Sequence, residues 1–135
     1  LSPGGGAVKR LLPIFRSGLG GPAGSGRQLM SWISLPDLAA IIRHLVARPE
    51  ISGPVNAVSP YPATNAEFSR ALGRALGRPA VFPVPGAMLR LLYGGMADET
   101  ILSSVGAIPA VLQSSGFQWE TPRIEHALQQ CLSKE

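Results

Sequence analysis

Apolar residues recur along this chain at intervals of three and four, the spacing of helices that bury one side. The clearest run lies between Leu38 and Val46, where Ile41, Ile42 and Leu45 complete a single stripe. The same spacing predicts helices over residues 7–15, 36–47, 65–77, 88–93, 98–104 and 109–115, and a last helix that begins at Thr121 and turns Cys131 toward the core.

Polar caps and turn-forming residues mark the ends of these helices. Thr64 and Glu67 have the spacing of a capping box, in which the side chain of each bonds the backbone N–H of the other. Ser34 stands in the same relation to Asp37, which we interpret as a carboxylate at a helix N-terminus. Gly77 is typical of a residue that ends a helix. These boundaries are therefore predicted from local chemistry alone.

Short apolar runs predict extended segments at residues 28–33, 55–58 and 81–82, and an extended crossing at 117–119. The run 55–58 is expected to be a buried strand, whose backbone N–H and C=O groups need partners on both sides. The sequence holds few other strands and no obvious hairpin that would supply these partners. The β-structure therefore looks like a piece of a larger sheet.

Composition limits the class of protein. The chain has 135 residues, which is enough for one domain with a hydrophobic core and too few for two domains of ordinary size. Its 16 Gly and 13 Pro gather at turns without a Gly-X-Y repeat, which excludes a collagen-like chain, and its single cysteine excludes an intramolecular disulfide framework. The longest uncharged stretch, 100–119, contains Pro, Gly, Ser and Gln and is a poor membrane span, and the N-terminus does not read as a signal peptide. We therefore expect a soluble, cytoplasmic protein.

The charge pattern allows two interpretations. Lys and Arg number 12 against 8 Asp and Glu, which gives a net charge of +4. If the helix predicted over residues 65–77 continues to Arg78, then Arg70, Arg74 and Arg78 share one of its faces. Such a face indicates either an anionic partner or a solvated surface. No aromatic residues are interleaved with these arginines for base stacking, which favours a solvated surface over a nucleic-acid partner.

Familiar catalytic motifs do not form in this sequence. The stretch from Gly18 to Ala23 matches G-x-G-x-x-A, the dinucleotide fingerprint, but lacks the preceding strand and the following helix that the fingerprint requires. We interpret it as a flexible surface loop. His44 and His126 lie far apart, each without a second ligand one turn away, so no metal site is expected. No G-x-S-x-G nucleophile motif is present either.

The block from Gly24 to Leu38 carries a family resemblance. It reads GSGRQLMSWISLPDL and resembles the G-x-G-x-Q…Asp-Leu segment in the C-terminal half of extended short-chain dehydrogenase/reductases, the nucleotide-sugar epimerase group. Residues 55–58, followed by Thr64 and Glu67, look like that group's next strand and helix. The phrases GGGA, GLGGP, TNAEF and ALGRP are similar to those of an atypical branch, the epimerase family proteins with a C-terminal domain of unknown function. The resemblance covers nearly the whole chain.

The resemblance implies an α/β fold: a mostly helical C-terminal substrate-side lobe with a few short strands, completing a Rossmann-type sheet whose N-terminal part is absent from this chain. Residues 1–60 would end the Rossmann region, and residues 61–135 would form the C-terminal helical domain of unknown function. Full-length members use NADP, held by a glycine-rich loop near their N-terminus, and no cofactor is expected for this chain alone. The implied partner is the missing N-terminal Rossmann half, or another chain that supplies it.

The resemblance also implies which residues face the substrate. We expect Arg27, Gln28 and Trp32 on that side, with no catalytic residue and no metal ligand. Classical members carry an Arg two residues after the Gln to hold a phosphate; here that position is Met30, which argues against a nucleotide sugar. Trp32 is expected to pack rather than to stack on a ligand.

The function implied is the substrate-side part of an NADP-linked epimerase- or reductase-like protein acting on an unknown small molecule. The Tyr-x-x-x-Lys pair of active members is missing, since Tyr61 and Tyr93 have no Lys four residues later. The chain is therefore not expected to catalyse alone. The alternative is a stand-alone, non-catalytic module that binds an anionic partner through the basic helix face.

Overall fold

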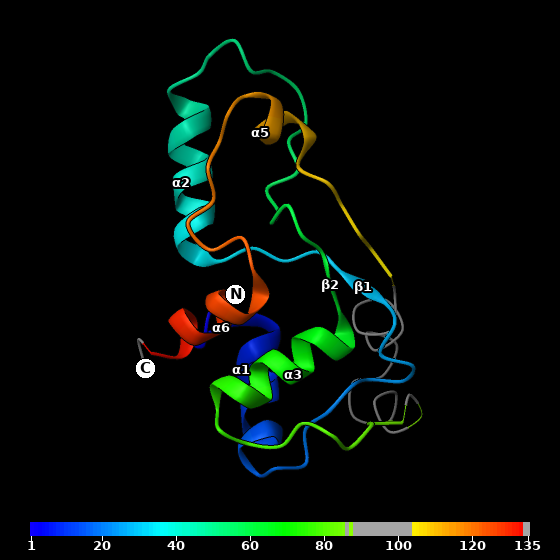
Figure 1. Ribbon diagram of the computed structural model, residues 1–135. Helices are drawn as coiled ribbons and strands as arrows, with labels where there is room; N and C mark the ends of the chain where they lie inside the picture. The colour runs from blue at the N-terminus through cyan, green and yellow to red at the C-terminus, as the bar shows by residue number, and fades with distance from the viewer. Residues whose placement is uncertain (86, 88–103, 134–135) are drawn as a thin grey trace.

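A computed structural model of the protein describes residues 1–85, 87 and 104–133, and these are mostly helical (Figure 1). Helices α1, α3 and α6 gather in the lower part of Figure 1, α2 and α5 lie in the upper part, and strands β1 and β2 lie between the two groups. The bounds are α1 Gly6–Arg16, β1 Leu29–Met30, α2 Leu35–Val46, β2 Ala63–Thr64, α3 Asn65–Ala75, α5 Ala110–Ser114 and α6 Ile124–Leu132.

The regular β-structure of the described residues is one antiparallel pair, β1 with β2. The pairing is short because α3 begins at Asn65, directly after β2. Gln28 accepts from the N–H of Asn65 at 3.0 Å, and Trp32 accepts from the N–H of Ser59 at 2.7 Å. The extended segment predicted over residues 28–33 is thus confirmed as a strand only at Leu29–Met30.

Two hydrophobic cores can be described in the residues that the structure covers, and the larger lies where α1, α3 and α6 meet. Helix α3 packs against α6, and each helix buries the side that its apolar stripe predicts. Phe15 of α1 is 2% exposed, and Leu72 of α3 and Leu128 of α6 are 0% exposed. The remaining members of this core are Val8, Leu12, Trp32, Ala63, Phe68, Ala71, Ile124 and Ala127.

A smaller core lies between α2 and α5. Its buried members are Ile41, Leu112 and Phe117, and Val55 and Trp119 pack against them. Both cores draw residues from before and after residue 60. The division into two domains at that residue stays a prediction.

A short corner between Val58 and Tyr61 joins the two cores. Trp32, from the larger core, donates its indole N–H to the Tyr61 carbonyl at 2.9 Å. Trp119, packed on the smaller core, donates its indole N–H to the Val58 carbonyl at 3.1 Å. Ser59, inside the corner, is 2% exposed. The cores are therefore tied to one segment by hydrogen bonds from both sides.

The starts of α2 and α3 that the sequence predicts are confirmed. The Thr64 hydroxyl accepts from the Glu67 N–H at 3.2 Å, and the Glu67 carboxylate accepts from the Thr64 N–H at 2.7 Å, which completes the capping box. The Ser34 hydroxyl accepts from the Asp37 N–H at 3.1 Å and caps α2. Gly77 follows the end of α3 with a φ of +64°, which glycine adopts without strain.

The strands predicted at residues 55–58 and 81–82 do not form within the part of the chain that is described. The segment 55–58 has no neighbouring strand there to pair with, and the Asn56 side chain bonds the Ile108 carbonyl instead. Val81 and Phe82 are 71% and 56% exposed, and they lie among prolines that lack the N–H a ladder needs.

Two further expectations need correction. The last helix begins at Ile124 rather than Thr121, because the Thr121 hydroxyl bonds Asp37 and does not cap the helix. Helix α3 ends at Ala75, so Arg78 follows the turn at Gly77 and does not share a helix face with Arg70 and Arg74. The basic face expected on α3 therefore loses its third member.

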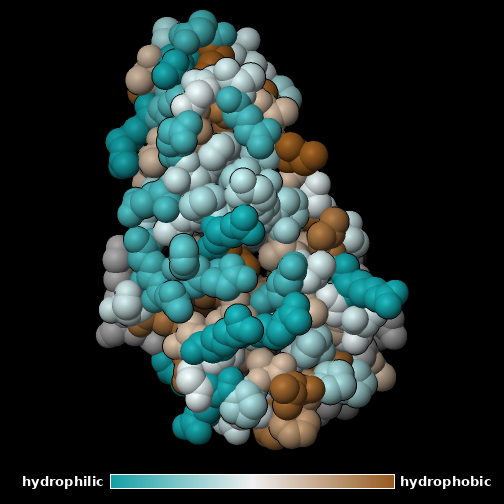
Figure 2. All heavy atoms as spheres, viewed as in Figure 1, coloured by the Kyte–Doolittle hydropathy of each residue, from teal (hydrophilic) through white to brown (hydrophobic). Residues whose placement is uncertain are grey.

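Some expectations lie outside the described residues: the helix over 88–93 and nearly all of that over 98–104. Helix α5 confirms the one predicted over 109–115. Within the described ranges, no helix has the length and apolar character needed to cross a membrane. Figure 2 shows that the face seen in Figure 1 carries mainly hydrophilic side chains, with apolar ones in separate small patches.

Candidate functional site

The glycine-rich loop between α1 and β1 is held by hydrogen bonds from two buried side-chain amides. The Asn65 side-chain carbonyl accepts from the Ala23 N–H at 2.6 Å, and the Gln28 side-chain amide donates to the Ala23 carbonyl at 3.0 Å. Asn65 and Gln28 are 6% and 8% exposed. Because both polar groups of Ala23 are bonded to buried partners, the loop has a fixed central point.

Backbone and hydroxyl contacts fix the rest of the loop. The Ser69 hydroxyl of α3 donates to the Gly21 carbonyl at 3.2 Å, and the Val84 N–H donates to the Pro22 carbonyl at 2.8 Å. A Cβ on Gly21 would collide with the backbone carbonyl of Phe82, so glycine is required for this close approach. The loop is tied to α3 and to residues 82–84, so it is not the flexible surface loop that the sequence suggested.

The loop does not fit the pyrophosphate of a dinucleotide. Such a cradle presents unpaired backbone N–H groups to the phosphates. Here the N–H of Ala23 bonds Asn65, that of Gly24 bonds Val84 and that of Gly26 bonds the Ala23 carbonyl. Within the fingerprint itself, the N–H groups of Gly18 and Leu19 bond carbonyls of the preceding helix, as that of Ala23 bonds Asn65. No cofactor chemistry is assigned to this loop.

Removing the Asn65 anchor gives a test of this arrangement. Asn65→Ala leaves the Ala23 N–H buried without an acceptor, which is expected to cost about 1–3 kcal/mol of unfolding free energy. Hydrogen exchange at Ala23 is expected to accelerate by about fivefold or more, as follows from that cost. The control is Ser25→Ala, which changes an exposed hydroxyl in the same loop. Unchanged exchange at Ala23 in the Asn65 variant would contradict the anchoring role.

Asp37 forms a second buried polar centre, between α2 and the segment before α6. It is 1% exposed. Its carboxylate accepts from the Ser34 hydroxyl at 2.8 Å, the Glu120 N–H at 2.8 Å, the Thr121 N–H at 3.2 Å and the Thr121 hydroxyl at 2.8 Å. Burial by itself raises the pKa of Asp37, but these hydrogen bonds outweigh it and hold the pKa below its ordinary value. Asp37 is thus an ionised carboxylate that joins the start of α2 to the segment before α6. The sequence predicted only its place at the start of a helix.

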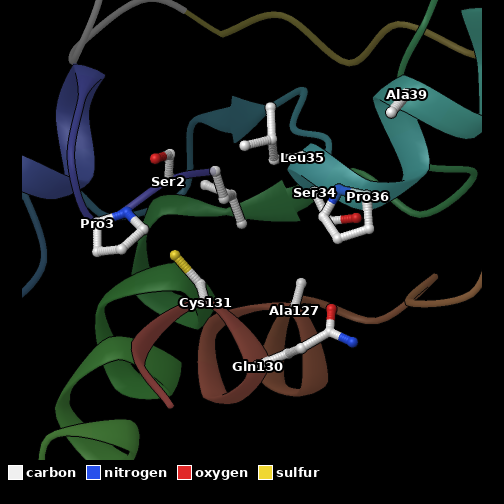
Figure 3. A pocket seen from close by; sticks show the side chains of 10 residues that line it. Ser2, Pro3, Ser34, Leu35, Pro36, Ala39, Ala127, Gln130 and Cys131 are labelled. Atoms are coloured by element: carbon white, nitrogen blue, oxygen red, sulfur yellow. The ribbon is translucent and has the colours of Figure 1, made fainter. Parts of the chain in front are cut away.

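Two surface hollows accompany these centres. One, of about 330 Å³, lies beside the corner at residues 58–61 and combines aromatic with amide side chains; it is lined by Pro60, Tyr61, Gln113, Phe117, Gln118, Trp119 and Pro122. The other, of about 370 Å³, lies between α2 and α6. Figure 3 shows Leu35 and Ala39 of α2 on one side of this second hollow and Ala127 and Cys131 of α6 on the other.

The titratable residues weighed at the sequence level lie apart from one another. His44 shares a 2.8 Å hydrogen bond with the Ser115 hydroxyl and meets the Phe117 ring edge-on. His126 is exposed on α6, and Cys131 is half-buried at the second hollow. In the ranges that the structure covers, no three His, Cys, Asp or Glu residues are grouped to hold a metal ion.

Comparison with known proteins places these features in a family. Residues 84–131 match the family model described as "Domain of unknown function (DUF1731)". The chain is 47% identical over 128 residues to "Epimerase family protein Mb2239" of Mycobacterium bovis, covering 95% of this chain and 42% of that protein. It is 40% identical over 133 residues to the human "Epimerase family protein SDR39U1", covering 98% of this chain and 45% of that protein. The chain is related to the C-terminal part of the epimerase family proteins.

A solved structure of the epimerase family shares this fold. The crystal structure of human SDR39U1 (isoform 2) with NADPH matches the whole of this chain with a TM-score of 0.92 and 38% identity, and the chain covers 46% of it. The chain spans less than half the length of these relatives. The family resemblance seen in the sequence is confirmed, and NADPH is the cofactor present in that relative.

Of the three substrate-side candidates, only Arg27 carries an exposed side chain. Gln28 anchors the loop, and Trp32 lies in the larger core at 6% exposure, in keeping with the expectation that it packs. Direct contact of these residues with a substrate stays a prediction. Sequence reasoning missed Asn65 and Ser69, which bond the glycine-rich loop. The TNAEF phrase includes Asn65, but nothing in it indicates that the Asn65 side chain holds this loop.

Proposed function

We propose that this chain is the substrate-side part of an NADP-linked epimerase- or reductase-like protein, and that cofactor binding and catalysis use residues outside this sequence. The observation that carries the proposal is the segment 55–58. Val55 and Ala57 pack against the smaller core, yet no described residue pairs with the backbone of this segment in a ladder. A half-buried run of this kind is expected to find backbone partners.

The missing partners would be strands of a Rossmann-type sheet that residues 55–58 extend. The relatives have the length for such a half, because this chain covers only 42–46% of them. The human relative was solved with NADPH. In this chain the glycine-rich loop bonds its own backbone, so a cofactor would be held by the other half.

This part would form one wall of the substrate site. The anchored loop presents the exposed Arg27 side chain, a cation suited to an anionic group on a small substrate. Gln28 and Asn65 hold the loop that carries it. With no Tyr-x-x-x-Lys pair in the sequence, the wall binds and orients but does not transfer a proton.

Titration calorimetry with NADPH tests the proposal. The chain alone is expected to show no binding in the micromolar range, whereas a fusion in which it replaces the matched region of human SDR39U1 is expected to bind NADPH. Human SDR39U1 itself is the positive control. Micromolar binding by the chain alone, or a folded fusion that fails to bind, would contradict the proposal.

A further inference from the structure

One end of the molecule carries large apolar side chains that are open to solvent. They come from the start of the glycine-rich loop, just after α1, and from the chain that follows α3, in the lower part of Figure 1. Leu19 is 65% exposed, and Val81 and Phe82 are 71% and 56% exposed. Figure 2 also shows apolar side chains at the lower end of the face seen there. We call Leu19, Val81 and Phe82 the apolar tip.

Backbone contacts bring the apolar tip together and hold it. Phe82 lies directly against Gly21, where a Cβ would collide with the Phe82 carbonyl, and Leu19 precedes Gly21 by two residues. The segment after α3 is fixed on both sides of the tip, because the Arg78 N–H donates to a carbonyl of α3 and the Val84 N–H donates to one of the loop. Scattered surface hydrophobics need no explanation, but a gathered and pre-organised set indicates an interaction surface.

Cations accompany the apolar tip. Arg74, in the last turn of α3, and Arg78, just before the tip residues of the following segment, both have exposed side chains. The stretches of chain that build this end, residues 1–36 and 68–97, contain no Asp or Glu. The dipole of α3 favours Arg74, but Arg78 follows the turn at Gly77 and is not explained in this way. This end therefore combines apolar side chains with positive charge.

We infer that this end of the protein binds the surface of a membrane that contains anionic lipids. Proteins that lie on a membrane without crossing it insert apolar side chains at the boundary between headgroups and acyl chains, and flanking cations attract anionic headgroups. Leu19 and Val81 keep most of their area exposed, as insertion requires. The inference does not depend on the proposed function and goes beyond it.

Other occupants fit this end less well. Two of the three tip side chains are aliphatic and offer no ring on which nucleic-acid bases could stack. Two copies of the chain that met through this end would bring the arginines of both together, without an acid from the same stretches to offset them. An acidic protein is the remaining alternative, and the experiment separates it from a lipid surface.

Co-sedimentation with vesicles tests the inference, with the fusion to human SDR39U1 as the protein. The fusion is expected to bind vesicles of equal parts phosphatidylcholine and phosphatidylglycerol, to bind them less as salt is added, and not to bind phosphatidylcholine alone. Arg74→Gln with Arg78→Gln is expected to weaken binding about 25-fold, at about fivefold for each cation. Leu19→Asn with Val81→Asn is expected to weaken it about tenfold or more, because neither side chain then enters the lipid.

Matched controls make the same kinds of change elsewhere. Arg43→Gln with Arg48→Gln removes two cations in and just after α2. Val105→Asn with Ile108→Asn changes two aliphatic side chains, 58% and 60% exposed, in the segment before α5. Both controls are expected to bind mixed vesicles as the unsubstituted fusion does. All four double variants are expected to keep the melting temperature within about 2 °C, so a loss of binding is not a loss of fold.

Val81→Trp gives a second measurement that needs no loss of binding. Its indole emission is expected to move to shorter wavelength with the mixed vesicles and to stay unchanged with phosphatidylcholine alone. No change with the mixed vesicles would mean that the tip does not insert, and the inference would fail.

Three further results would overturn the inference. The unsubstituted fusion could fail to bind mixed vesicles, the controls could weaken binding as much as the variants of this end, or the Leu19 and Val81 variant could bind undiminished. Binding to polyglutamate instead of vesicles would identify an acidic protein as the occupant and would also overturn it. NADPH binding by the fusion is measured separately, so each of these results leaves the proposed function standing.

Discussion

Asp37→Ala is expected to lower the free energy of unfolding by about 3–5 kcal/mol, because the change strands several buried donors at once. The carboxylate is 1% exposed and accepts from Ser34, Glu120 and both donors of Thr121. Urea unfolding at pH 7 measures the effect. The control is Glu125→Gln, which changes an exposed acid on α6 and is expected to alter stability by less than about 0.5 kcal/mol.

The same residue makes part of the stability depend on pH. The folded pKa of Asp37 lies below its ordinary value of about 3.9, so its contribution is present above that value and is lost as the pH falls through the folded pKa. The difference in stability between the protein and Asp37→Asn is therefore expected to be largest near neutral pH and to shrink below about pH 4. A difference that grows on acidification would mean that Asp37 is protonated in the folded protein.

Leu72→Ala is expected to cost about 2–5 kcal/mol, the range for emptying a buried leucine site. Leu72 is 0% exposed in α3, at the centre of the core shared with α1 and α6. The loss should appear in urea unfolding followed by circular dichroism, as one transition moved to lower denaturant.

The control for that change is Leu76→Ala, just past the end of α3. Leu76 packs against the same core but is only partly buried, so its loss should be clearly smaller. Equal effects at the two positions would show that the core is not organised around α3.

The parts of this fold that sequence predicts well are governed by neighbouring residues. The capping box of Thr64 and Glu67 and the Ser34 cap of α2 each join groups three residues apart. The single stripe predicted on α2 is buried only in part, because Ile42 and Val46 are 56% and 79% exposed. The apolar stripes of α1, α3 and α6 follow from helical spacing alone. For these elements, tertiary contacts agree with the local preference instead of overriding it.

The parts that sequence misses depend on distant contacts. The hydrogen bond from Thr121 to Asp37 joins residues 84 positions apart, and it removes the hydroxyl expected to start the last helix. No spacing rule shows such a pairing. The run 55–58 was expected to be a strand whose partners this sequence does not supply, and within the described residues its backbone forms no ladder.

The candidate site shows the same division. Arg27, Gln28 and Trp32 were identified by family resemblance rather than by local chemistry, and the structure separates them into an exposed cation, a loop anchor and a core residue. Asn65 begins the helix predicted over residues 65–77, but no role was predicted for its side chain. Its bond to Ala23 crosses 42 positions and could not be read from the sequence.

The corner between Val58 and Tyr61 gives this protein a built-in spectroscopic probe. Its two tryptophans both donate to that corner, Trp32 from one core and Trp119 from the other. Indole emission responds to hydrogen bonding and to solvent, so intrinsic fluorescence reports whether the junction of the cores is intact. Separation of the cores would become visible without any label, even while each helix stayed folded.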